Sequence, residues 1–351
     1  MILDIIQTII NHSNLPDQIS LLNINKYVYK NVHIYSIKCT LCMDQLIIEQ
    51  HKFSKLKRIY IFNDKINNVN HLADTLEELH CYKKFYFRQG DGYNIDQEGI
   101  SQLKKLKVLN CSNNKKIYCV NHLANTLETL TCDGDSGIDQ NGISELKKIT
   151  KLMCYKNKKI NNVNHLKDTL KELCCGGCCS IDQSGISKLN KLVSLNCYNN
   201  KNIHTVSHLS KTLIKLDCGS ESRVNQDQIN QLKNLVTLCC NFNKTINDVN
   251  HLADTLEELY CTYDSGINQN GISKLNKLKI LDFTNNGKID NVNHLKNTLE
   301  ELYCGGYICN ANQEGISELN KLKILDCNSN PHIYCLNRFS ETLEELDCSC
   351  N

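Results

Sequence analysis

The stretch IDQEGISQLKKLKVLNCSNN, residues 95–114, contains the pattern that decides the fold of this chain. Its second half reads LxxLxCxxN, with Leu106, Leu109 and Cys111 as the apolar residues and Asn114 three residues after the cysteine. Side chains of a strand alternate between its two faces, so Leu109 and Cys111 point to the same side of a short strand. Together with Leu106 they form an apolar surface that a single copy cannot bury, so the pattern requires neighbours of its own kind.

Copies of this pattern recur along almost the whole chain. The segment HLADTLEELHC at 71–81 returns at 122, 165, 208, 251, 294 and, degraded, at 338, in steps of 51, 43, 43, 43, 43 and 44 residues. Segments similar to 95–114 lie between these copies, so each 43-residue period holds two repeats of 21 and 22 residues. Such a period indicates an architecture in which stacked repeats bury each other's apolar side.

The repeats resemble the leucine-rich repeat signature LxxLxLxxN/CxL, with cysteine in the third leucine position. The resemblance covers residues from about 56 to 351 in thirteen clear copies. It implies an α/β solenoid of about fourteen repeats, a horseshoe with parallel strands on its concave face. Asparagine side chains bond backbone groups where a chain leaves a strand, so we expect them to form a ladder along the stack. These asparagines are Asn114, Asn157, Asn200, Asn243, Asn286 and Asn330.

The 22 cysteines raise the question of a metal or redox site. Cys174, Cys175, Cys178 and Cys179 lie within six positions, and Cys175 and Cys178 have the CxxC spacing of zinc ribbons and thiol oxidoreductases. The repeat, however, places Cys175 in the core, Cys174 on the opposite, concave face, and the other two in the loop after the strand. We therefore expect no metal and no cofactor, and a thiol or zinc enzyme stays open only through Cys174, Cys178 and Cys179. Twelve cysteines are predicted to be reduced core residues that act as small apolar side chains: Cys81, Cys111, Cys132, Cys154, Cys175, Cys197, Cys218, Cys240, Cys261, Cys304, Cys327 and Cys348.

Histidine also recurs once per period, at positions 71, 122, 165, 208, 251 and 294. Consecutive copies are two repeats apart, about 10 Å, which is too far for them to share a metal ion. No Ser-His-Asp, GxGxxG or paired-carboxylate arrangement stands outside the repeat, and residues that recur with it do not make a catalytic constellation. We expect structural histidines and a protein that is not an enzyme.

Composition and charge narrow the classes of partner. The chain has 40 basic and 38 acidic residues and no basic run, which argues against nucleic acid and anionic membranes. No apolar stretch reaches the length of about 18 residues that a membrane span needs, and the N-terminus lacks a signal-peptide pattern. We therefore expect a cytoplasmic protein with reduced thiols.

Residues 1–38 precede the repeats and carry apolar side chains at helical spacing. They resemble the F-box, a short three-helix motif that docks substrate receptors onto the adaptor subunit of cullin-type ubiquitin ligases. The resemblance implies adaptor contacts at Ile5, Ile9, Leu15 and Ile19; the alternative is a plain helical cap on the first repeat. The residues that carry it are Ile5-Ile6-x-x-Ile9-Ile10, Leu15-x-Asp17-x-Ile19-Ser20-Leu21-Leu22 and Asn25-Lys26-x-Val28-Tyr29.

The predicted plan has three parts: an F-box-like or capping segment at 1–38, a connector with a degenerate start of the repeats at 39–55, and the solenoid at 56–351. This plan resembles the leucine-rich repeat and F-box proteins of giant DNA viruses of amoebae. The resemblance implies a substrate receptor for a ubiquitin ligase in the host cell cytoplasm. The alternative is a binding module with no ubiquitin link, which binds or blocks a host protein.

We predict that a protein partner binds the concave face, where acidic residues lie beside tyrosines. A mixed polar surface of this kind is also what any solvated sheet face carries. The longer first period places an aromatic-rich loop at 82–93, which either protrudes or folds back on the cap. The sequence stops at Asn351 directly after a predicted strand, so we expect the last repeat to fray or to self-associate. The predicted partner-binding residues are Tyr82, Phe85, Tyr86, Phe87, Tyr155, Tyr198, Asp217, Tyr260 and Tyr303.

Overall fold

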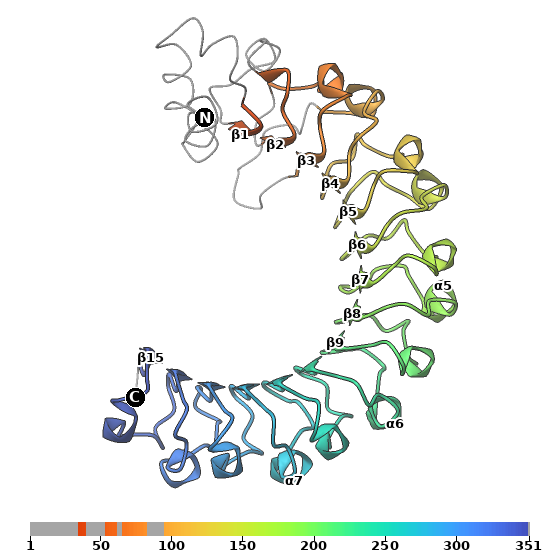
Figure 1. The fold of residues 1–351 in the computed structure, drawn as a ribbon. Coiled ribbons are helices and arrows are strands. Elements are labelled where there is room, and N and C mark those ends of the chain that lie inside the picture. Colours follow the sequence, from red (N-terminus) through yellow and green to blue (C-terminus); the bar gives the residue numbers. More distant parts are fainter. Residues whose placement is uncertain (1–33, 40–52, 62–64, 83–94, 350–351) are drawn as a thin grey trace, which may run out of the picture. The chain divides into compact units, whose positions relative to one another are not determined.

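The computed structural model describes residues 34–39, 53–61, 65–82 and 95–349, which belong to two compact units, residues 1–170 and 171–351. Within each unit the chain repeats a short strand, a turn and a single turn of helix, and each such repeat is called a rung below (Figure 1). The strands lie on the inner side of each unit's curve and the helical turns on its outer side (Figure 1). This arrangement confirms the predicted leucine-rich repeat solenoid.

Unit 1 contains a parallel sheet whose strands follow one another in chain order. The helical turns among its described residues are of the 3-10 type. The strands are β1 (Ser36–Cys39), β2 (Arg58–Ile61), β3 (Glu78–His80), β4 (Val108–Asn110), β5 (Thr129–Thr131) and β6 (Lys151–Met153). The helical turns are η2 (Asn70–Leu72), η3 (Glu98–Ile100), η4 (Asn121–Leu123), η5 (Asn141–Ile143) and η6 (Asn164–Leu166).

Unit 2 has the same parallel order of strands and mixes 3-10 turns with one-turn α-helices. None of the helices in the described ranges is long and apolar enough to cross a membrane. The strands are β7 (Glu172–Cys174), β8 (Ser194–Asn196), β9 (Lys215–Asp217), β10 (Thr237–Cys239), β11 (Glu258–Tyr260), β12 (Ile280–Asp282), β13 (Glu301–Tyr303), β14 (Ile324–Asp326) and β15 (Glu345–Asp347). The helical turns are α5 (Gln183–Ile186), η7 (Ser207–Leu209), α6 (Gln226–Ile229), η8 (Asn250–Leu252), α7 (Gln269–Ile272), η9 (Asn293–Leu295), η10 (Glu314–Ile316) and η11 (Asn337–Phe339).

Strand β1 lies ahead of the predicted start of the repeats, in the segment that the sequence assigned to the cap and connector. It pairs in parallel with β2, with Ser36 opposite Arg58. Its sequence contains the repeat spacing in a changed form, because Ile34 and Ile37 stand where the later copies have leucine and Cys39 follows as usual. Within the described residues, the stack of strands therefore begins with β1.

The core consists of the leucine and cysteine positions of the repeat. In the copy at residues 95–114, Leu106, Leu109 and Cys111 are all fully buried. Eleven of the twelve cysteines predicted for the core are buried. The prediction is wrong for Cys348, which is exposed because it follows β15 and no further strand covers it in the described part of the chain.

The predicted asparagine ladder is present and links every second rung to the one before it. Asn200 is fully buried, and its Nδ2 donates to the carbonyl oxygens of Cys175 at 2.7 Å and Ile181 at 3.0 Å. Its Oδ1 accepts a bond from the backbone N–H of Asn202 at 3.0 Å. The same donor bonds recur 43 residues later, from Asn243 to Cys218 and Val224. One buried amide thus satisfies backbone groups of two rungs.

Histidine and glutamine form two further ladders. His165 Nε2 donates to the carbonyl oxygen of Ile143 at 3.0 Å, and His208 does the same to Ile186 at 3.2 Å, which confirms the structural role expected for the histidines. Burial lowers the pKa of both histidines, so both are neutral at physiological pH. The glutamine ladder was not predicted: Gln140 donates to the carbonyl of Asn162 and accepts from its N–H, both at 2.9 Å.

Candidate binding surface

From β2 to β14, the first and third residues of each strand face the inner side of the curve, while the second residue points into the core. In β12, Leu281 is fully buried, whereas Ile280 and Asp282 on either side of it are partly exposed. This alternation follows from the period of two in a strand. The inner surface of each unit, here called its strand face, is therefore made of these first and third residues.

The strand face of unit 2 is strongly acidic. Among the first and third residues of β7 to β15, eight are carboxylates and one, Lys215, is a base. Neighbouring parallel strands lie about 4.8 Å apart, so these carboxylates share one continuous surface. They are Glu172, Asp217, Glu258, Asp282, Glu301, Asp326, Glu345 and Asp347.

Tyrosine alternates with aspartate along the third strand position of this face. The strand register places Asp282 between Tyr260 and Tyr303, with Asp326 next in the row. The first strand position alternates in the same rungs between glutamate and isoleucine. The alternation arises because each 43-residue period holds two different repeats, and it gives the face aromatic and charged groups side by side.

The aspartates of this face also accept hydrogen bonds in the turns that follow their own strands. Asp282 Oδ1 accepts a bond from the backbone N–H of Thr284 at 3.0 Å, and Asp326 Oδ1 accepts one from Asn328 at 3.0 Å. Asp217 accepts from Gly219 at 3.2 Å and from Asn196 Nδ2 at 2.8 Å. Burial raises the pKa of Asp217 and Asp282, because a half-buried carboxylate loses part of its hydration.

The two tyrosines keep their protons on this face. Burial, helped by the hydrogen bond from its hydroxyl to Glu301 Oε2 at 3.1 Å, raises the pKa of Tyr303 to about 12. Burial and the charge of Glu258 also raise the pKa of Tyr260. Both side chains therefore present a ring and a protonated hydroxyl, the combination that is enriched where proteins bind proteins.

The strand face of unit 1 is different in kind. The ring of Tyr60 stacks on His80 at 4.4 Å between centroids, and His80 meets Tyr82 edge-on at 6.4 Å. Glu78 accepts a bond from the Tyr60 hydroxyl at 3.1 Å, lies 2.7 Å from His80 Nε2 and forms an ion pair with Arg58 at 3.0 Å. The carboxylate of Glu78 is thus already engaged by three neighbouring side chains.

The predicted partner-binding residues fall into separate places. Asp217, Tyr260 and Tyr303 share the strand face of unit 2, and Tyr198 lies at its margin, two residues beyond β8. In unit 1, Tyr82 joins the cluster around His80, and Tyr155 lies beneath the ammonium of Lys156, which is 5.3 Å from the ring centroid. Phe85, Tyr86, Phe87 and the predicted adaptor contacts Ile5, Ile9, Leu15 and Ile19 lie outside the described residues.

The cysteine group around Cys175 is a part of the repeat. Cys175 is fully buried, which raises its pKa well above the usual range. Cys179 is also buried, in the place that Ser222 and Ser265 occupy in other rungs. Cys174 has the expected strand position but is only 7% exposed, so it is less accessible than the predicted concave-face position implied. Within the described ranges, no group of three His, Cys, Asp or Glu side chains is placed to hold a metal ion.

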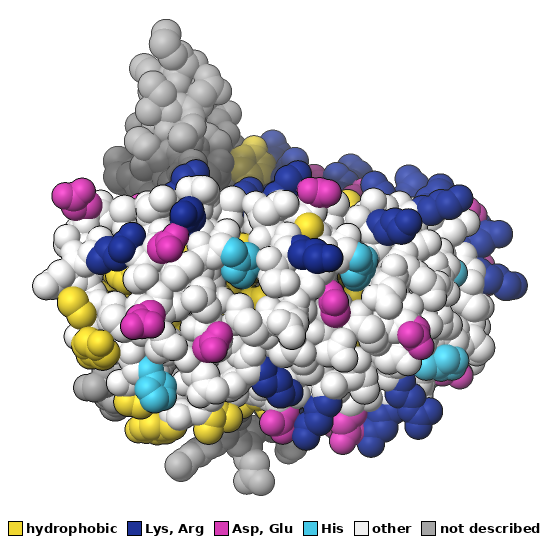
Figure 2. Space-filling view, turned by 90° about the horizontal axis from the view of Figure 1, so that it is seen from below, with side chains coloured by type: hydrophobic (Ala, Val, Ile, Leu, Met, Phe, Trp, Pro, Cys, Tyr) yellow, Lys and Arg dark blue, Asp and Glu magenta, His cyan; other side chains and the backbone are white. Residues whose placement is uncertain are grey.

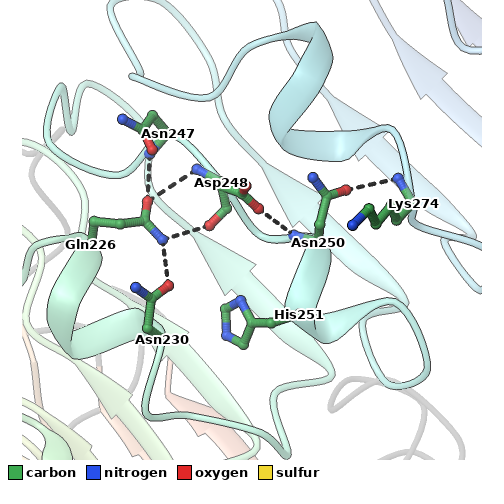
Figure 3. A pocket seen from close by; sticks show the side chains of 7 residues that line it. All are labelled: Gln226, Asn230, Asn247, Asp248, Asn250, His251 and Lys274. Carbon is green, nitrogen blue, oxygen red and sulfur yellow. Dashed lines mark hydrogen bonds between the residues drawn. The ribbon is translucent and has the colours of Figure 1, made fainter.

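A hollow of about 510 Å³ on the outer side of unit 2 has polar walls whose groups are engaged in the repeat (Figure 3). Gln226 Oε1 accepts bonds from the backbone of Asn247 and Asp248 at 2.8 and 3.0 Å. Asn250 Oδ1 accepts one from the backbone of Lys274 at 2.7 Å. These are ladder contacts, so the hollow is a product of the stacking. The face seen in Figure 2 carries charges of both signs scattered among uncharged side chains.

Comparison with known proteins supports the fold. No protein-family model matches this sequence, and no curated protein matches it. Among solved structures, the functional domain of InlJ from Listeria monocytogenes, which includes a cysteine ladder, matches with a TM-score of 0.51 and 21% identity over 84% of this chain and 63% of that one. An internalin, InlF, from the same species matches with a TM-score of 0.50 and 19% identity over 85% of this chain and 82% of that one. This chain thus spans less than two thirds of the InlJ domain.

Proposed function

We propose that this protein is a non-catalytic binding module whose unit 2 strand face takes up a basic segment of a partner protein. The observation that carries the proposal is the ratio of eight carboxylates to one lysine on that face. Complementary charge attracts and selects a partner, and it suppresses binding of acidic competitors. The leucine-rich repeat fold supports it by presenting these groups on one continuous sheet surface.

The tyrosines give this face more than charge. Tyr260 and Tyr303 alternate with Asp282 and Asp326 at the spacing of neighbouring strands. Aromatic rings anchor partner side chains, and lysine or arginine bound over a ring also gains a cation–π attraction. An extended basic segment that crosses the strands therefore meets rings and carboxylates alternately.

The cysteines support a role without catalysis. The thiolate is the nucleophilic form of cysteine, and burial disfavours it. Cys239 occupies the strand face, yet burial and then the charge of Asp217 raise its pKa far above the usual range. Burial likewise raises the pKa of the neighbouring Cys240 to about 12. Among the residues that the structure describes, no positively charged side chain lowers the pKa of either thiol.

A fluorescent hexalysine peptide tests the proposal through its dissociation constant at low ionic strength. A variant with Asp217→Asn, Glu258→Gln, Asp282→Asn, Glu301→Gln and Asp326→Asn should bind roughly 70-fold more weakly, at about 0.5 kcal/mol for each lost charge. Affinity of the unaltered protein should also fall as salt is added.

The matched control removes five exposed carboxylates that lie outside this face: Asp135→Asn, Glu145→Gln, Asp227→Asn, Asp254→Asn and Glu314→Gln. It changes the net charge by the same amount, so its affinity should stay within about twofold of the unaltered protein. Equal losses in both variants would mean that the peptide senses only total charge, and the proposed face would be rejected.

We also propose a finer version of this function, in which residues 1–38 dock the protein onto the adaptor of a cullin-type ubiquitin ligase. Its support is the F-box resemblance of that segment and the likeness of the whole plan to the giant-virus proteins. The test compares the full chain with an Ile5→Lys and Leu15→Lys variant in a pull-down of the adaptor from amoebal lysate. Substitutions are preferable to deletion of 1–38, because β1 begins at Ser36.

We expect the full chain to retain the adaptor and this variant to lose it. The variant should bind hexalysine as tightly as the unaltered protein does. If the full chain does not retain the adaptor, the ligase version is rejected. The alternative then stands, a binding module with no ubiquitin link that binds or blocks a host protein.

A further inference from the structure

The turn after each strand from β4 to β14 places a residue in the left-handed region of backbone conformation, two positions after the core cysteine or its replacement. This place lies three residues beyond the last residue of the strand. Glycine and asparagine tolerate the conformation best, and large side chains adopt it rarely. In unit 2 the residues are Gly177, Asn199, Ser220, Phe242, Tyr263, Asn285, Gly306 and Ser329.

Phe242 and Tyr263 are exceptions at this place. Their φ angles are 59° and 56°, so each large side chain is held in a conformation that the other rungs of unit 2 give to small or polar residues. Both are also exposed, Phe242 at 42% and Tyr263 at 44%. Backbone strain and exposed aromatic surface each lower the stability of a fold, so two adjacent rungs with both features indicate a use for the rings.

The two rings form a stack on the protein surface. Their centroids are 4.5 Å apart and their planes differ by 10°, which matches the spacing of successive rungs. The flanking rungs carry Ser220 and Asn285 at the same place, and neither side chain is large enough to cover a ring. Each outer ring face thus offers a platform for one more flat group at the same interval.

Acidic residues accompany both ends of this stack. The rung of Ser220 carries Asp217 on its strand face, and the rung of Asn285 carries Asp282. The ammonium of Lys244, two residues after Phe242 in the chain, lies 3.1 Å from Asp264, so its positive charge is balanced within the protein. A flat cation suits such surroundings better than a neutral or anionic ring, because ring faces and carboxylates both attract positive charge.

We propose that the Phe242–Tyr263 stack is an arginine-binding site, in which a guanidinium group of the basic partner lies on an outer ring face beside Asp217 or Asp282. This inference rests on the proposed function and names the side chain that the partner contributes. Arginine fits and lysine does not, because the guanidinium is planar and stacks on aromatic rings while an ammonium is compact and strongly hydrated.

The test measures the affinities of hexa-arginine and hexalysine peptides for the full chain and for a Phe242→Asn, Tyr263→Asn double variant. Asparagine is the natural residue at this place in the rungs of Asn199 and Asn285, so the variant should fold with an unchanged or higher melting temperature. The unaltered protein should prefer hexa-arginine, and the double variant should lose about fivefold of that preference. Hexalysine affinity should stay the same.

A Phe242→Tyr variant is the conservative control, and it should keep the full preference for hexa-arginine because the stack is retained. An unchanged preference in the double variant overturns the arginine site while leaving the acidic face in place. Failure of both peptides to bind the unaltered protein overturns the proposed function and this site with it. A dimer in light scattering that the double variant converts to a monomer also overturns the site, since a second copy would then occupy the rings.

Discussion

The strand faces of units 1 and 2 are built in the same way and carry different chemistry. On β2 to β6 the charged residues at first and third positions are Arg58, Glu78 and Lys151, with His80 as a further titratable group. On β7 to β15 the same positions hold eight carboxylates and one lysine. Central strand residues are buried from β2 to β14, so the core of the repeat does not require this difference. The comparison teaches that the repeat fixes its core and its ladders and leaves the inner surface open to specialisation.

The largest expected effect tests the part that the units share. Asn157→Ala in unit 1 and Asn243→Ala in unit 2 each remove two donated bonds and leave buried carbonyls without a donor. Each change should lower the free energy of unfolding by about 3 kcal/mol in urea denaturation. The exposed Asn161→Ala and Asn247→Ala serve as controls and should stay within about 0.5 kcal/mol. Clearly unequal losses would show that the two units do not have the same scaffold.

A smaller effect concerns the histidine ladder, again in both units. Burial lowers the pKa of His165 and His208, so stability is present above the ordinary histidine pKa of about 6.5 and is lost as the pH falls through the lowered value. His165→Ala and His208→Ala should each cost about 1 kcal/mol at pH 7 through the lost bond. Each variant should also lose less stability than the unaltered protein between pH 7 and 5. Thermal melts between pH 7 and 5 measure both the loss at pH 7 and its dependence on pH. A steeper fall of stability with pH in the variants would contradict a buried, neutral histidine.

The smallest effect exchanges residues between the two faces. Asn110 in unit 1 and Asp282 in unit 2 make the same turn bond, to the backbone N–H two residues later, at 3.1 and 3.0 Å. Burial raises the pKa of Asp282. The stability that the protonated side chain gives the fold is therefore fully present below the ordinary aspartate pKa of about 3.9 and is lost as the pH rises through the raised value. Asp282→Asn should therefore raise the free energy of unfolding by about 0.5 kcal/mol at neutral pH and leave it unchanged in acid. Asn110→Asp should lower it by a similar amount at neutral pH and leave it unchanged in acid. Urea denaturation at neutral and at acidic pH measures these changes. A loss of stability for Asp282→Asn at neutral pH would mean that the turn needs a charge.

The fold could be predicted because the same apolar spacing returns every 43 residues. Strand β1 was missed because isoleucine replaces both leucines at Ile34 and Ile37. The exposure of Cys348 could not be read from its motif, since burial of a rung depends on the rung after it.

The candidate site was predictable only in part. Tyr260 and Tyr303 were found from the repeat, but the dual role of Asp217 depends on a turn bond that sequence spacing does not show. Phe242 and Tyr263 lie 21 residues apart and meet only when their rungs stack in register. Their signal in the sequence was a large ring at a place where most rungs have glycine, asparagine or serine.

The asparagine ladder gives the stack a direction. Each of these amides donates to the preceding rung, as Asn286 does to Cys261 and Ile267 and Asn330 does to Cys304 and Ala311. A rung that leaves the ribosome thus finds its acceptors already folded, and a rung that peels from the C-terminal end takes its own amide with it. Peeling from the other end instead removes the acceptors and leaves the amide of the next rung to bond water. Synthesis therefore extends the stack in the direction in which each of these amides finds its acceptors in place.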